Sequence, residues 1–308
     1  MAEEVMTEGR EIYFADQKAL RRYKVLRIIN RVILYGFLTL VALFMLIPFY
    51  WMLSTSLKTS TELSNELTLG VVHFFPHEIT FANLGAIFNT SGSANFGRYY
   101  LNTIIVALAS TAITIVTTIL SAFAFARLNF KGKEIVFTIL LATMMIPGEM
   151  MVITNYQTVS VLGWRNTYSA LIFVHCVSVF YIFFLRQTFQ QIPNELYLAS
   201  KVDGYGDFAY LLKIMIPIAM PTIVTIIILG VMGSWNAYVW PTLVTESKDM
   251  QLVANGLMSI FQDSAYSQPE FNNIKLAASV VVTTPLLVFF IIFKKYIMRG
   301  VSRSGIKG

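Results

Sequence analysis

Long stretches without a charged side chain most constrain the fold of this 308-residue chain. Each can hold the roughly 20 residues that a helix needs to cross about 30 Å of hydrocarbon. Five of them contain no Asp, Glu, Lys or Arg: Val32–Leu57, Tyr99–Ala126, Asn166–Leu185, Ile214–Thr245 and Leu276–Phe293. A sixth stretch, Ile135–Tyr156, is interrupted only by Glu149. The pattern therefore predicts a chain that crosses a membrane several times.

The composition agrees with this prediction. Charged residues make up 13% of the chain and hydrophobic residues 56%, whereas a soluble domain has about 25% charged residues. Only helices and closed barrels satisfy their backbone in lipid, and these stretches show no strand-like alternation. We therefore predict an all-α membrane protein with six transmembrane helices, with cores near 32–53, 101–126, 135–156, 168–186, 214–235 and 276–294. The net charge of +6 does not indicate nucleic-acid binding, because the basic residues flank the apolar spans.

The distribution of Lys and Arg predicts the orientation, since cytoplasmic segments carry most of them. Eighteen of the 23 lie in the two tails and in the loops after the second and fourth spans. We expect a cytoplasmic tail at 1–31, a six-helix domain at 32–298 with a cytoplasmic loop at about 187–213, and a cytoplasmic tail at 299–308. The leader of about 30 residues and the lack of a small-x-small site predict that the first span is not a cleaved signal peptide.

Motifs for catalysis and for metal binding are weak in this sequence. No G-x-x-x-x-G-K-[ST] motif occurs, so the chain is not expected to hydrolyse ATP. The residues 204–209 fit a dinucleotide-binding motif by letter, but membrane spans flank them and no strand precedes them. His73 and His77 have i, i+4 spacing, yet Pro76 between them argues against one helical face, and no third ligand is evident. We therefore expect no enzyme, no catalytic residue, no metal site and no cofactor bound by this chain.

One polar segment, Ile192–Pro221, lies between the fourth and fifth spans and is more ordered than a simple connector needs. Pro193 suits a helix start, Asn194 is a good cap, and Glu195 is favourable in the first turn. Gly204 ends the helix or allows a sharp bend. Four residues can share one side of this helix: Leu196, Ala199, Ser200 and Asp203. Short side chains there would let another protein approach the backbone, whereas the alternative is a solvated connector.

This segment resembles the cytoplasmic EAA loop of ABC importer permeases. In the carbohydrate branch the loop reads roughly I-P-x-E-L-x-E-A-A-x-I-D-G-A, followed by a later proline. The matching residues are Ile192, Pro193, Glu195, Leu196, Ala199, Val202, Asp203, Gly204 and Pro217. Leu198 replaces the namesake Glu, Ser200 the second Ala, and Tyr205 the Ala after Asp-Gly. A polar contact of the family Glu with the ATPase would be absent or moved here, with Glu195 the nearest remaining acid.

Further segments look like the MalG-like subunit of sugar importers. They are Phe125–Gly132, the region around Met145–Pro147, Leu185–Gln187, Trp235–Asn236 and Gly305–Gly308. The resemblance implies a type I ABC importer transmembrane domain in a bacterial-type inner membrane. It also implies that the partners are a second permease subunit, an ATP-binding subunit dimer that uses ATP and Mg, and an extracytoplasmic solute-binding protein.

The resemblance assigns roles to particular residues. It implies ATPase coupling through Glu195, Leu196, Ala199, Ser200, Asp203 and Gly204. In relatives the loop between the last two spans, here Asn236–Lys275, can reach into the binding protein, and the C-terminal tail, here Gly305–Gly308, contacts the ATPase.

The substrate expected from the resemblance is an oligosaccharide or a related sugar. Sugars are bound by aromatic faces with amide and hydroxyl groups, which suggests a path along Tyr156, Trp235, Asn236, Tyr238 and Trp240. Glu149, the carboxylate inside an apolar stretch, is a further path candidate. The alternative for the aromatic residues is an interfacial belt, which Trp and Tyr favour. The alternatives for the function are an ABC permease for a non-sugar solute, an ion-coupled secondary carrier and a membrane scaffold.

Overall fold

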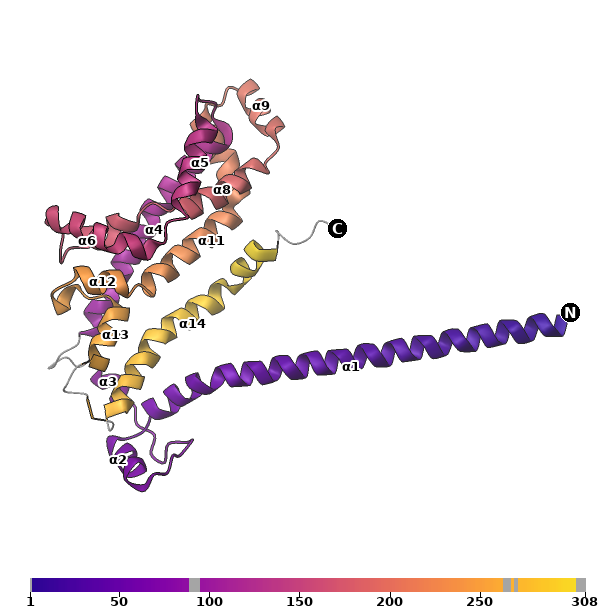
Figure 1. Ribbon diagram of the computed structural model, residues 1–308, viewed down its shortest axis with the longest axis horizontal. Helices are drawn as coiled ribbons and strands as arrows, with labels where there is room; N and C mark the ends of the chain where they lie inside the picture. The colour runs from indigo at the N-terminus through magenta and orange to yellow at the C-terminus, as the bar shows by residue number, and fades with distance from the viewer. Residues whose placement is uncertain (1, 89–94, 263–266, 269–270, 303–308) are drawn as a thin grey trace. The chain divides into compact units, whose positions relative to one another are not determined.

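The computed structural model describes residues 2–88, 95–262, 267–268 and 271–302 (Figure 1). All regular structure in these residues is helical, which confirms the prediction of an all-α protein. The chain divides into two compact units, Met1–Ser54 and Thr55–Gly308. The first unit is formed by helix α1 (Ala2–Ser56) as far as Ser54, and this helix extends the predicted core at 32–53 toward the N-terminus.

The remaining helices belong to the second unit. They are α2 (Ser60–Leu69), α3 (Ala82–Ala86), α4 (Phe96–Arg127), α5 (Lys133–Thr143), α6 (Met151–Val161), α7 (Tyr168–Ile172), α8 (Val179–Gln190), α9 (Asn194–Val202), α10 (Asp207–Tyr210), α11 (Ile216–Trp235), α12 (Val239–Val244), α13 (Val253–Gln262) and α14 (Asn272–Ser302). Shorter 3-10 or π turns are η1 (Gly148–Met150), η2 (Phe173–His175), η3 (Leu211–Met215) and η4 (Lys248–Met250).

Four helical stretches are long and apolar enough to cross a membrane on their own: Arg22–Ser56, Phe96–Arg127, Asp207–Trp235 and Asn272–Tyr296. Two helix pairs meet this requirement only together, Lys133–Thr143 with Gly148–Val161 and Tyr168–His175 with Val179–Gln190. These pairs bend by 78° and 44°. The described residues therefore hold the six predicted spans when each bent pair is counted once, but the third and fourth spans are broken rather than straight.

Both breaks have local causes. Before α6, Pro147 has no N–H to donate and disfavours the helical conformation at Ile146. Before α8, Ser178 adopts an extended conformation, and its Oγ accepts a hydrogen bond of 3.3 Å from the Tyr181 N–H. The hydroxyl of Thr117 on α4 donates to the Cys176 carbonyl at 3.1 Å. A backbone group released by the second break is thus satisfied inside the protein, as lipid requires.

The main core lies where α4 packs against α8 and α11, which run side by side in Figure 1. Its most buried apolar residues are Ala122, Phe123, Leu185, Phe189, Ile192, Tyr210, Leu211, Met215, Ala219, Ile223 and Ile226. Gly230 on α11 faces Thr111 on α4, and a Cβ there would lie 3.0 Å from Thr111 Oγ1. Small residues therefore permit the close helix contact, as is common in membrane proteins.

The α2 segment, residues 57–80, folds back on itself around a buried ion pair. The Lys58 ammonium is fully buried and donates to Glu66 Oε1 and to the His73 carbonyl, both at 2.6 Å. The Thr80 N–H donates to the Leu57 carbonyl at 2.9 Å, which closes the segment. Burial raises the pKa of the Glu66 carboxyl, but hydrogen bonds from Lys58 and His73 and the Lys58 charge outweigh it, so that the pKa lies below its ordinary value.

We expect Gly256→Ala to destabilise the second unit. A Cβ on this residue of α13 would lie 2.4 Å from Cδ2 of Tyr99, whose ring is fully buried and cannot move aside. Overpacking of this kind costs about 1–3 kcal/mol. Thermal unfolding of the detergent-solubilised protein should show a lower Tm than the wild type. Gly85→Ala, with nothing within 4 Å of its new Cβ, is the matched control. Equal Tm values for the two variants would contradict this packing.

Glu66→Gln should destabilise the α2 segment, because it leaves the buried Lys58 ammonium without its carboxylate. Loss of one partner of a buried pair costs about 3 kcal/mol. Since the folded-state pKa of Glu66 is lowered, its stabilisation is present above the unfolded pKa and is lost as the pH falls through the folded value. The free energy of unfolding, measured from pH 7 to pH 3, should therefore be higher for the wild type than for the variant at pH 7 and similar for both in acid. A constant difference would show that the pair does not titrate.

Candidate functional site

The polar segment after the fourth span forms helix α9, which projects beyond the ends of α8 and α11 in Figure 1. The helix ends as the sequence predicts, with Asp203 as the C-terminal cap and Gly204 in the left-handed region at φ 82°. The prediction that Asn194 caps the helix is wrong. Pro193 occupies the N-cap position, and Asn194 is the first helical residue. Its side-chain oxygen instead accepts a long 3.4 Å hydrogen bond from Arg127.

The side of α9 that points to solvent contains all of the predicted coupling residues except Ser200. Of the residues predicted to couple, Glu195, Leu196, Ala199, Asp203 and Gly204 are exposed. Ser200 is only 2% exposed and its hydroxyl donates to the Tyr197 carbonyl at 2.7 Å, so its predicted place on the shared open side is wrong. Helical spacing turns Ser200 with Tyr197 toward the protein.

Two apolar side chains on the outward side were missed as contact residues. Leu198 is 57% exposed and Val202 is 88% exposed. They lie four residues apart and are therefore neighbours on one face. The sequence could have indicated them, because two apolar residues at i, i+4 spacing stand out in a polar loop. We name Glu195, Leu198, Ala199 and Val202 the outer face of α9.

Arg127, in the last turn of α4, fixes the start of α9. Its guanidinium donates to the carbonyls of Phe189, at 3.0 Å, and of Ile192. These carbonyls lie at and just after the C-terminal end of α8, where a cation is favourable. A single charged side chain therefore connects the end of α4 to the end of α8 and to the first residue of α9.

A second set of contacts fixes the other end of α9. The Tyr197 hydroxyl and the Lys201 ammonium both donate to Asp207 Oδ1, at 2.7 and 2.5 Å. The Tyr197 ring meets the buried Tyr210 ring edge-on, with 5.0 Å between the ring centroids. The hydrogen bond to Asp207 is the main reason that the pKa of Tyr197, and likewise that of Lys201, is raised. Both groups keep their protons at neutral pH, and α9 is attached to α10 at the start of the fifth span.

A cavity of about 860 Å³ lies between α4, α8, α11 and α12. Its polar lining consists of hydroxyl groups and one imidazole, from Ser110, Thr111, Thr114, Ser178, Tyr181, Ser234, Tyr238 and His175. Its apolar lining includes Phe180 and Trp240. No Asp, Glu, Lys or Arg is found among the described residues that line it. Such a cavity suits an uncharged molecule with many hydroxyl groups.

The residues predicted along the substrate path do not form one group. Tyr238 and Trp240 line the cavity, and the indole N–H of Trp240 donates to the Ala170 carbonyl at 2.9 Å. The other four lie outside its lining. The indole of Trp235 donates to Val282, Asn236 donates to Met232, Tyr156 lies under the Arg165 guanidinium, and Glu149 is exposed in η1.

The sequence analysis missed most of the polar residues of the cavity, including three hydroxyl groups of α4. Taken one by one, Ser110, Thr111 and Thr114 are ordinary residues of a membrane span. Together they form a polar stripe on neighbouring positions of the helix, which the sequence does show. Ser110 Oγ lies 3.2 Å from Ser234 Oγ on α11, which joins the two sides of the cavity wall.

The two remaining expected contact regions are only partly described. Asn236–Lys275 contains α12, η4 and α13, with residues 263–266 and 269–270 outside the described residues. Asn102 on α4 holds this region by donating to the carbonyls of Asp249 and Gln251 at 2.7 and 2.9 Å. The tail Gly305–Gly308 lies outside the described residues.

Comparison with known proteins identifies close similarity to transporter components. Residues 115–303 match the family described as binding-protein-dependent transport system inner membrane component. The arabinooligosaccharides transport system permease protein AraQ of Bacillus subtilis is 30% identical over 91% of this chain and 97% of its own length. The lactose transport system permease protein LacG of Rhizobium radiobacter is 28% identical over 86% of this chain and 93% of its own.

A solved structure has the same fold. One chain of a bacterial ABC transporter involved in the import of the acidic polysaccharide alginate superposes with a TM-score of 0.76 at 21% identity. The similarity covers 87% of this chain and 96% of that chain. The predicted type I importer fold is thereby confirmed.

Arg127→Met should loosen α9 without changing the spans. The variant removes the guanidinium hydrogen bonds to the ends of α8 and α9 but keeps a side chain of similar length. We expect amide hydrogen exchange over residues 192–205 to become about tenfold faster, as after the loss of a charge-assisted hydrogen bond of about 1.4 kcal/mol. Lys131→Met, an exposed basic residue in the neighbouring loop, is the charge-matched control. Unchanged exchange in Arg127→Met would rule out this role.

Proposed function

This chain belongs to the family of binding-protein-dependent transport system inner membrane components, and we propose that it is the membrane-spanning permease subunit of an ATP-driven importer for an uncharged oligosaccharide. The relatives named above act on arabinooligosaccharides and lactose, which supports a carbohydrate as the transported class. As a membrane component of an importer, the chain is not itself an enzyme.

The exposed outer face of α9 is the observation that carries this proposal. A helix with two large apolar side chains in water is stabilised when a partner covers them, and Leu198 and Val202 are such side chains. The partner is a separate ATPase, because the 308 residues contain no phosphate-binding loop. ATP and Mg are used on that ATPase, and the outer face of α9 fits a groove on it.

Coupling follows from how α9 is attached. Arg127 ties its start to α4 and α8, and Tyr197 and Lys201 tie its end to Asp207 at the start of the fifth span. Movement of the ATPase would therefore move the ends of α4, α8 and α11 with α9. A two-state change of the pore needs a rigid connection of this kind.

The cavity supports an uncharged, hydroxyl-rich solute. Its serine, threonine and tyrosine hydroxyls can exchange hydrogen bonds with sugar hydroxyls, and the faces of Tyr238 and Trp240 can pack on sugar rings. The acidic polysaccharide alginate of the structural relative would call for cationic groups, which the described lining lacks. The predicted path roles of Glu149, Tyr156, Trp235 and Asn236 remain predictions.

The partners in this proposal are a second permease subunit, which would form the other half of the pore, an ATPase dimer and an extracytoplasmic solute-binding protein. The family description itself names a binding-protein-dependent system. The distribution of Lys and Arg supports cytoplasmic termini and a cytoplasmic α9, with the α2 segment on the opposite side.

The test is to alter the outer face of α9 in the complete transporter. Ala199→Trp adds bulk and Val202→Glu adds charge at exposed positions, so neither should disturb folding or membrane insertion. We expect co-purification of the ATPase to fall at least tenfold, and sugar uptake in proteoliposomes to fall with it. Leu69→Glu, a 72% exposed residue of the α2 segment, is the control that should keep the ATPase. Full association and uptake in both variants would overturn the coupling role of α9.

A further inference from the structure

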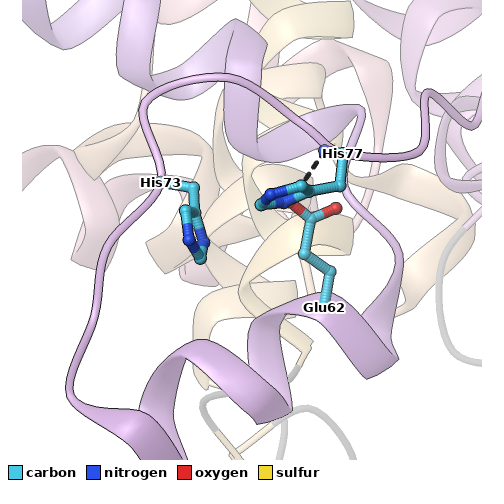
Figure 2. A group of neighbouring side chains, drawn as sticks. All are labelled: Glu62, His73 and His77. Carbon is cyan, nitrogen blue, oxygen red and sulfur yellow. Dashed lines mark hydrogen bonds and ion pairs between the residues drawn. The ribbon is translucent and has the colours of Figure 1, made fainter.

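A group of three potential metal ligands lies in the α2 segment, away from the cavity and from α9. Figure 2 shows the His77 ring against the Glu62 carboxylate and the His73 ring beside that of His77. The expectation of no metal site had two grounds: Pro76 argues against a helix that would place both histidines on one face, and no third ligand was evident in the sequence. The structure has no helix there. Residues 71–80 return over α2 as a loop, which brings His77 to Glu62 in the first turn and His73 to Glu66 one turn further on.

Glu62 is held with one oxygen engaged and the other free of hydrogen bonds. Its side chain is 10% exposed. Oε1 accepts the His77 backbone N–H at 3.0 Å and lies 3.2 Å from His77 Nδ1. Oε2 is buried and accepts no hydrogen bond from any described residue. A buried carboxylate oxygen without a partner is costly, and a cation is one way to satisfy it.

A second acid, one turn further along α2, orients the other histidine. Glu66 Oε1 accepts the His73 N–H at 3.0 Å and lies 3.1 Å from His73 Nδ1. The carboxylate beside Nδ1 of His77 is that of Glu62 itself, so the His77 ring turns when both bind one ion. His73 has a separate carboxylate, that of Glu66, beside Nδ1, which leaves its Nε2 as the available nitrogen. Metal-binding histidines are oriented in this way by a carboxylate on the other ring nitrogen. Lys58 neutralises Glu66, so Glu66 serves to orient His73 rather than to bind metal.

We propose that Glu62, His73 and His77 bind a divalent transition metal ion of the zinc class. Their ligand atoms lie within 4.8 Å of one another. Two imidazoles with one carboxylate and a free position are typical of zinc, whereas calcium and magnesium take sets of oxygen ligands. Ligands of one tetrahedral zinc ion lie about 3.3 Å apart. His73 and His77 are 40% and 64% exposed, so rotation of their side chains supplies the remaining approach.

The surroundings leave room for a fourth ligand. The cleft at this group measures about 360 Å³ and is also lined by Asn65 and Glu78. The ion would join the first turn of α2 to the returning loop, and so add a second link to the one made by Lys58, Glu66 and His73. In the proposed orientation the site faces the extracytoplasmic side, where the binding protein docks.

The experiment is to titrate Zn²⁺ into the purified transporter in nanodiscs, prepared with an affinity tag that contains no histidine. Calorimetry and elemental analysis should give one zinc ion per copy of this chain, with micromolar or tighter Kd. His77→Ala, which alters a mainly exposed side chain, and Glu62→Gln should each weaken binding at least tenfold. Cobalt in place of zinc should give the visible absorption of a tetrahedral site, lost in both variants.

The chain provides its own control, since its third histidine, His175, lies in the cavity. His175→Gln should bind zinc like the wild type. Chelation should lower the Tm of the wild type and leave that of His77→Ala unchanged. Binding that is equal in wild type, His77→Ala and Glu62→Gln, or that is absent from the wild type at submillimolar zinc, would overturn the proposal.

Discussion

The backbone of a chain in lipid has to satisfy its own N–H and C=O groups, and the rest of this structure depends on that constraint. It makes every described regular element a helix. It also governs the second broken span, where the Thr117 hydroxyl donates to the Cys176 carbonyl at the break. Hydroxyls inside α4 bond back to their own helix, as Thr103 does to Tyr99 and Ser110 to Val106. These hydroxyls are therefore satisfied within the protein, whereas the buried hydroxyls of Thr111 and Thr118 have no hydrogen-bond partner among the described residues.

Charged side chains gather at the span ends and hold them together. Arg186 on α8 donates to the Phe125 carbonyl at the end of α4 and to both oxygens of Glu134 on α5, and it lies 3.9 Å from the Phe137 ring centroid. Arg127 makes the corresponding link from α4 to α8 and α9. Three spans thus end in one connected polar layer beside α9. A force on α9 would reach all of them, which is what the proposed coupling requires.

The α2 segment uses the same chemistry for another purpose. Two acids one turn apart, Glu62 and Glu66, each receive a backbone N–H and an imidazole from the returning loop. Lys58 lies beside Glu66, whereas no Lys or Arg among the described residues is paired with Glu62. Glu66 therefore forms a structural ion pair with Lys58, whereas Glu62 keeps a carboxylate oxygen that accepts no hydrogen bond from the described residues. The sequence shows that two acids and two histidines lie close together in the chain. Which acid pairs with which histidine depends on how the loop folds.

The sequence by itself determined the membrane class, the spans and the place of α9, because apolar length, charge and the Pro193–Gly204 boundaries are local properties. It could not determine which way each side chain faces. Ser200 turned inward, and Leu198 and Val202 turned outward, since the contacts of Tyr197 and Lys201 with Asp207 set the rotation of α9. The cavity and the Glu62 group likewise bring together residues far apart in the chain or joined by an irregular loop. Such groupings depend on packing and on loop geometry, which only the tertiary structure decided.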